Sequence, residues 1–108
     1  MPDFISITDQ DNNRSIKVSL GKGLSVALGE NPTTGFTWHL QPGSQDILAL
    51  ESDDYELGAA SAVGGSGIRQ FRFRAMAAGK AAIRLRYRRS WEPAEKFIRE
   101  FALDVSVE

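Results

Sequence analysis

One histidine, His39, and many hydroxyl side chains are the first candidates for chemistry in this sequence. Hydrolysis by a nucleophile needs a serine, threonine or cysteine beside a base, which is usually histidine. The chain has no cysteine, so it forms neither a thiol nucleophile nor a disulfide. His39 follows Trp38 at a position whose side chain should face solvent, which indicates a solvated strand residue instead of a base. We therefore expect a protein that is not an enzyme.

Oxygen-rich and glycine-rich stretches are the candidates for binding ions and phosphates. Residues 9–13 (DQDNN) open like a calcium loop, but Arg14 stands where that loop needs glycine and Leu20 where it needs glutamate. Residues 64–67 (GGSG) would cradle a phosphate at the start of a helix. The alternating residues that follow them predict a strand. We expect neither a metal nor a cofactor.

A basic cluster is the best argument for nucleic-acid binding. Eight of the 13 lysines and arginines lie between Arg69 and Arg89, and no acid occurs there. The members expected on one shared outward face are Arg72, Arg74, Arg84, Arg86 and Arg88. No aromatic side chain alternates with them to stack on bases. Glu100 and Asp104 have outward positions in the last predicted strand, so cross-strand ion pairs explain the cluster. We expect no nucleic-acid partner.

Apolar and polar residues alternate along most of the chain, which is the pattern of half-buried strands. The 108 residues, 42% of them hydrophobic, allow one domain, residues 1–108, with one modest core. The pattern predicts about seven strands: 14–20, 23–29, 36–41, 53–57, 68–75, 81–88 and 96–107. Residues 4–7 can add an eighth at an edge, and Gly79-Lys80 indicates a turn. Such short strands are typical of an all-β antiparallel sandwich or barrel.

Three unusual connections should meet at one end of this sandwich. Antiparallel strands reverse direction, so successive connections alternate between the two ends. Residues 30–35, 58–67 and 89–95 therefore share one end, and they contain the sequences NPTTG, GAASAVGGSG and RSWEPAE. Binding residues concentrate in loops on rigid scaffolds. The spacing therefore predicts a binding surface.

Two features of these connections each allow two interpretations. Trp91 can fold back over the core, or it can stand exposed as an anchor, since tryptophan is enriched at binding hot spots. Residues Gly64, Gly65, Ser66 and Gly67 can form a flexible hairpin tip. Alternatively, their backbone can lie close against a partner, because glycine has no Cβ.

Together the three connections resemble the motifs of the chagasin-type inhibitors of papain-like cysteine peptidases. The family pattern is NPTTG and an aromatic residue, then G-x-G, then R-P-[WF], and the resemblance covers nearly the whole chain. The matching residues are Asn31, Pro32, Thr33, Thr34, Gly35 and Phe36; then Gly65, Ser66 and Gly67; then Arg89, Ser90 and Trp91. Ser90 replaces the usual proline, so the last loop should be looser.

The resemblance implies an immunoglobulin-like β-sandwich that acts as a reversible, tight-binding inhibitor and has no activity of its own. It implies a papain-like cysteine peptidase as the partner. Residues 31–36 would lie nearest the active-site thiol, residues 64–67 on the non-primed side, and Arg89, Ser90 and Trp91 on the primed side. The alternative is a non-inhibitory immunoglobulin-like module that binds another protein through the same loops.

The remaining expectations concern assembly and location. We expect a monomer. A net charge of −1 gives no general attraction to membranes or nucleic acids, and no apolar run approaches the roughly 20 residues of a membrane span. Residues 1–4 do not open a secretory signal. The compartment stays undecided: cytoplasmic as the chain is written, or periplasmic or secreted if a signal has been removed.

Overall fold

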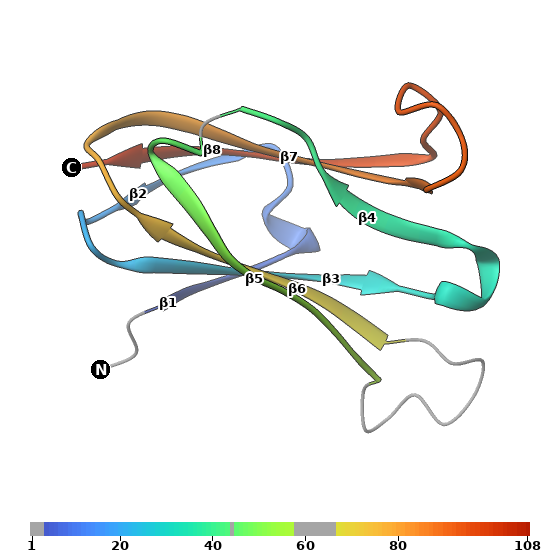
Figure 1. Cartoon of the computed structure of the whole chain (residues 1–108). Coiled ribbons are helices and arrows are strands. Elements are labelled where there is room, and N and C mark those ends of the chain that lie inside the picture. Colours follow the sequence, from blue (N-terminus) through green and yellow to red (C-terminus); the bar gives the residue numbers. More distant parts are fainter. Residues whose placement is uncertain (1–3, 44, 58–66) are drawn as a thin grey trace.

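Two four-stranded sheets pack face to face in the computed structural model, which describes residues 4–43, 45–57 and 67–108 (Figure 1). The described strands are β1 (Phe4–Thr8), β2 (Arg14–Val18), β3 (Gly23–Glu30), β4 (Phe36–Leu40), β5 (Leu48–Leu57), β6 (Gly67–Ala75), β7 (Gly79–Arg89) and β8 (Arg99–Val107). One sheet has the order β1-β3-β6-β5 and the other β2-β8-β7-β4. Two 3-10 turns, η1 (Asp9–Asp11) and η2 (Pro32–Thr34), complete the described elements. The predicted all-β sandwich is confirmed.

The core lies between the inner faces of the two sheets and follows the predicted alternation. On β3, Leu24, Val26 and Leu28 are all almost fully buried. The largest fully buried side chains are Phe71, Phe73 and Phe101, from β6 and β8. Each such side chain contributes roughly 1.5–3 kcal/mol by leaving water. A core of this kind makes the sandwich a stiff support for the loops at its ends.

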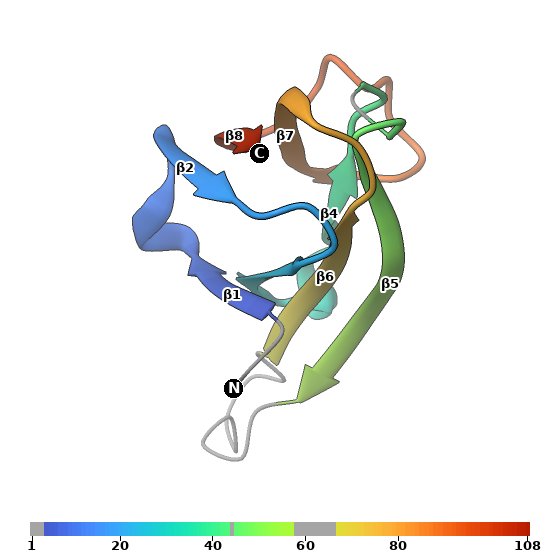
Figure 2. The ribbon, with the colours of Figure 1, turned by 90° about the vertical axis from the view of Figure 1, so that its left-hand side faces the viewer.

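Two strand pairs are parallel, whereas the sequence predicted antiparallel pairing throughout. β1 pairs with β3, and β2 pairs with β8, in parallel register, while the other described pairs are antiparallel. The chain changes sheets between β1 and β2 (Figure 2). Thr8 and Asp11 cap η1 at this crossing, and the hydrogen bond from Thr8 N lowers the pKa of Asp11. Residues 9–13 thus form a capped turn, where Asp11 also pairs with Arg14.

Three predicted strand starts are wrong by two residues or more, and β2 ends at Val18, two residues before its predicted end. β5 begins at Leu48, and a register shift between Leu50 and Ser52 interrupts the alternation that would have shown its first half. Gly79 and Lys80 open β7 instead of forming a turn, because the chain reverses at residues 76–78. Gly79 has a φ of 142°, which glycine adopts easily. β8 begins at Arg99, three residues later than predicted.

The basic cluster does not form one face. Arg72 and Arg74 lie on β6 and the other three arginines on β7, so they belong to different sheets whose outer faces point away from each other. The prediction failed because β6 and β7 follow each other in sequence but are not neighbours in a sheet. The predicted cross-strand pairs are confirmed: Arg86 Nε is 3.1 Å from Glu100 Oε2, and Arg84 Nη1 is 3.7 Å from Asp104 Oδ1. No helix in the described part of the chain could span a bilayer.

Candidate functional site

One end of the sandwich collects the strand ends that carry the three unusual connections, at the right of Figure 1. Glu30, which ends β3, is paired with Gly67, which begins β6, and Gly67 is also paired with Leu57 at the end of β5. In the other sheet Phe36, which begins β4, is paired with Arg89, which ends β7. The strand ends that flank the three connections therefore share one end, as the alternation predicted. We call residues 31–36, Gly67 and residues 89–91 the tip. Gly64, Gly65 and Ser66 lie outside the described residues.

The first part of the tip is a closed 3-10 turn held by its own side chains. Asn31 Oδ1 accepts hydrogen bonds from Thr33 N at 3.2 Å and from Thr33 Oγ1 at 2.6 Å. Thr34 Oγ1 donates to Asn31 O at 2.8 Å and accepts from Phe36 N at 3.3 Å. Both threonine hydroxyl hydrogens are therefore used inside the loop. A loop that is ordered before binding loses less entropy when it docks.

Gly35 and Trp91 join the first and last connections. Gly35 has a φ of 82°, in the region that favours glycine. A Cβ placed at Gly35 would lie 2.6 Å from Cη2 of Trp91, so the indole rests directly on this glycine. Trp91 is nevertheless 71% exposed. The structure thus supports the exposed anchor and not the lid over the core.

Arg89 extends this contact. Its guanidinium carbon lies 4.4 Å from the centroid of the Phe36 ring and 6.0 Å from that of Trp91. Arg88 Nη1 donates to Arg89 O at 3.3 Å and to Glu92 O at 3.2 Å, across the turn that contains Ser90. The last loop, predicted to be looser without its proline, is therefore held by arginine side chains.

An aromatic column supports the tip from inside the sandwich. The ring centroid of Tyr87 lies 4.9 Å from that of Trp38 and 5.6 Å from that of Phe36. The Tyr87 hydroxyl accepts a hydrogen bond from Asn31 N at 3.1 Å, and Trp38 Nε1 donates to Gly29 O at 2.9 Å. Trp38 is buried. The column fixes both ends of the 31–36 loop to the core.

An ion pair with a fully buried carboxylate lies beside this column. Arg69 Nη2 is 2.7 Å from Glu30 Oε2, and the two side chains are 21% and 0% exposed. The other oxygen, Glu30 Oε1, accepts a hydrogen bond from Trp38 N at 2.7 Å. Arg69 Nη1 also reaches Asp53 Oδ1 at 3.1 Å. The hydrogen bonds to Glu30 raise the pKa of Arg69, so this guanidinium stays charged.

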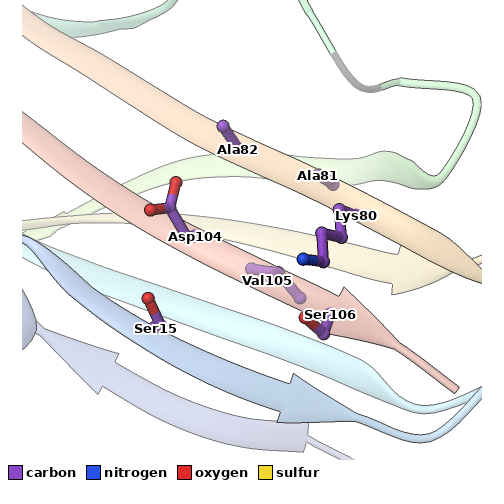
Figure 3. A pocket seen from close by; sticks show the side chains of 7 residues that line it. All are labelled: Ser15, Lys80, Ala81, Ala82, Asp104, Val105 and Ser106. Atoms are coloured by element: carbon purple, nitrogen blue, oxygen red, sulfur yellow. The ribbon is translucent and has the colours of Figure 1, made fainter.

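Shallow hollows lie on the surface that the described residues form. One, of about 530 Å³, lies on the outer face of β2, β8 and β7, where Lys80, Asp104 and Ser106 surround it (Figure 3). Another, of about 240 Å³, opens beneath the tip between Glu30, Gly67 and Tyr87 and other residues. The described residues include no group of three potential metal ligands. The tip is a projecting surface, which suits binding to another protein.

Outside the tip, His39 lies on β4, with Nε2 2.8 Å from Thr37 Oγ1. Burial, together with the charge of Arg88, lowers its pKa. Among the described residues, the hydrogen-bond partner of the His39 ring is a threonine two residues away on the same strand, which is a local structural contact.

Residues 17–105 match the family model described as the chagasin family peptidase inhibitor I42. This chain belongs to the chagasin family. Chagasin of Trypanosoma cruzi is 28% identical over 89 residues, which cover 79% of this chain and 81% of that protein. Amoebiasin-1 of Entamoeba histolytica is 29% identical over 106 residues, which cover 96% of this chain and all of that protein.

A solved structure supports the same fold. The cysteine protease inhibitor EhICP2 of Entamoeba histolytica superimposes with a TM-score of 0.85, at 23% identity, over 97% of this chain and 96% of that chain. The likeness covers both sheets of this chagasin-family chain and confirms the immunoglobulin-like sandwich as its fold class.

Within this chagasin-family fold, the structure brings the first and third motifs into contact and places Gly67 of the second beside the first. The sequence reading missed Glu30, Arg69, Tyr87 and Arg88, which hold these parts. For the ion pair a signal existed. Glu30 continues the inward positions of Leu24, Val26 and Leu28, and Arg69 shares the register of Phe71 and Phe73. A charged residue at an inward position is seldom buried without a partner.

Proposed function

We propose that the tip of this protein occludes the active-site cleft of its target peptidase. As a member of the chagasin family, the protein is an inhibitor of papain-like cysteine peptidases and not an enzyme. The observation that carries the proposal is the packing of Trp91 and Arg89 on Gly35 and Phe36. This packing makes one exposed surface from two motifs that are far apart in sequence.

In this proposal each part of the tip has its own place in the cleft. Residues 31–36 lie nearest the catalytic thiol, and Arg89, Ser90 and Trp91 occupy the primed side. Gly64, Gly65, Ser66 and Gly67 approach the non-primed side with their backbone. The closed turn of residues 31–34 explains why a peptidase would not cleave it, since attack needs a peptide bond held in a reactive geometry. An interface of this kind buries roughly 800 Å² on each partner.

Titration of active papain tests the proposal. We expect residual hydrolysis of a fluorogenic peptide to fall linearly with added protein until the two are equimolar, and activity to return on dilution. Mass spectrometry of the recovered protein should show an uncut chain. Absence of inhibition at micromolar concentration would contradict the proposed function and favour a non-inhibitory binding module.

Substitution of Ser90 by proline tests the last loop. No described hydrogen bond uses Ser90 N, and proline would restrict the unbound loop further. A compatible proline contributes about 0.4–1 kcal/mol, so the inhibition constant for papain should fall by up to about fivefold or stay unchanged. A large rise in the inhibition constant, with thermal stability kept, would show that this loop is wrongly placed in the cleft.

A further inference from the structure

The Glu30–Arg69 ion pair contacts strands of both sheets next to the tip. Glu30 is the last residue of β3, directly before the 31–36 loop. Trp38, whose backbone amide it holds, lies on β4 at the edge of the other sheet. The carboxylate therefore bonds the two sheets together at both ends of the loop that crosses between them.

Arg69 links Glu30 to the two strands that flank the second connection. It lies on β6, two residues after Gly67, and its Nη1 atom binds Asp53 on β5. Its guanidinium carbon also lies 5.4 Å from the ring centroid of Tyr55 on β5. β5 and β6 are the strands on either side of residues 58–66. The pair thus links the base of the first connection to both strands that carry the second.

Energetics argue that the ion pair has a role beyond stability. Removing two charges from water is costly, and apolar residues of similar size often replace a buried ion pair with no loss of stability. What an ion pair adds is direction, because a carboxylate and a guanidinium bind in a fixed planar geometry. Here Arg69 Nε and Nη2 both donate to Glu30 Oε2, at 3.1 Å and 2.7 Å.

We propose that Glu30 and Arg69 are positioning residues for inhibition, which hold the 31–36 loop and the strands bearing residues 58–66 at the spacing that a peptidase cleft requires. This inference rests on the proposed function. In the proposed complex, neither Glu30 nor Arg69 contacts the peptidase. The ion pair acts by fixing the positions of the loops. Loss of the pair should therefore weaken inhibition more than it lowers the stability of the fold.

The main test is the charge-free variant Glu30→Gln/Arg69→Met. Glutamine keeps an oxygen that can accept from Trp38 N, and methionine keeps the length and packing of the arginine stem. We expect the inhibition constant for papain to rise about tenfold or more, a factor that corresponds to about 1.4 kcal/mol. The melting temperature, measured by circular dichroism, should change much less than this loss of binding suggests.

Two matched controls separate position from charge and from stability. Glu51 and Arg74 form an exposed pair on the same two strands, β5 and β6. Glu51→Gln/Arg74→Met therefore makes the same chemical change away from the tip and should leave inhibition unchanged. Val105→Ala removes buried apolar volume on β8 near the end opposite the tip. It should lower the melting temperature without raising the inhibition constant.

The outcomes are distinct. If the wild-type protein fails to inhibit papain, the proposed function is wrong whatever the ion pair does. If the wild type inhibits and the folded charge-free variant inhibits equally well, the positioning role is wrong. It is also wrong if Val105→Ala raises the inhibition constant as much for an equal loss of melting temperature. If the double variant does not fold, Arg69→Lys keeps the charge but loses the planar contact, and should weaken inhibition with the fold intact.

Discussion

Replacing Trp91 by alanine should raise the inhibition constant for papain about 30-fold or more while the protein stays folded. The indole is 71% exposed and rests on Gly35 instead of entering the core. A tryptophan anchor that becomes buried in an interface contributes about 2 kcal/mol or more of binding free energy, which is the expected loss. Its removal should shift the melting temperature by about 3 °C or less, because little buried surface is lost. Enzyme titration and thermal unfolding measure the two effects.

Met76→Ala is the matched control for this variant. Met76 is 60% exposed in the turn between β6 and β7, at the end opposite the tip. Its truncation also removes a large exposed apolar side chain, and it should change neither inhibition nor stability. If Trp91→Ala instead lowers the melting temperature strongly, Trp91 belongs to the core. If it leaves inhibition unchanged, Trp91 lies outside the interface.

The period-two alternation predicted much of the fold because it is a direct result of strand geometry. Successive side chains of a strand point to opposite faces, so the buried Leu24, Val26 and Leu28 were visible in the sequence. Turn residues marked where the strands end. From these two signals alone, the three unusual connections could be placed at one end of the sandwich.

The alternation does not show which strands are neighbours. It shows which side chains face the core, and a parallel or an antiparallel partner leaves the same pattern. The parallel pairing of β1 with β3 and of β2 with β8 was therefore not predictable in this way. For the same reason the sequence analysis wrongly predicted that Arg72 and Arg84 share one face, although β6 and β7 lie in different sheets. The irregularity after Leu50 hid the start of β5 for a simpler reason, since it breaks the period.

Some of the contacts that support the tip could be predicted from the sequence, and others could not. The charges of Glu30 and Arg69 stand at inward positions, so the sequence contained a signal for a buried ion pair. No local pattern announces that the Tyr87 hydroxyl will bind Asn31 N, or that Trp91 will rest on Gly35. Each of these contacts joins residues 56 positions apart. They follow from the stacking of two sheets, which the sequence pattern implies only in outline.

Replacing Gly35 by alanine should damage both stability and inhibition, for two separate reasons. Its φ of 82° is costly for any residue with a Cβ, by about 1–2 kcal/mol, so the melting temperature should fall by about 5–10 °C. The new methyl group would also meet Trp91 Cη2 at 2.6 Å. Since the indole is exposed, it can swing away, and the tip then loses its anchor. The inhibition constant for papain should therefore rise by roughly 30-fold or more, as for loss of Trp91 itself.

The double variant Gly35→Ala/Trp91→Ala separates the two reasons. With the indole gone, the methyl group has nothing to displace, so the losses of binding should not add, while the loss of melting temperature from the backbone should remain. Gly29→Ala is the control: it lies at the end of β3, and a Cβ there has no atom within 4 Å. It should leave inhibition and stability nearly unchanged. Fully additive losses of binding would mean that Trp91 and Gly35 act independently and that the first and third motifs do not form one surface.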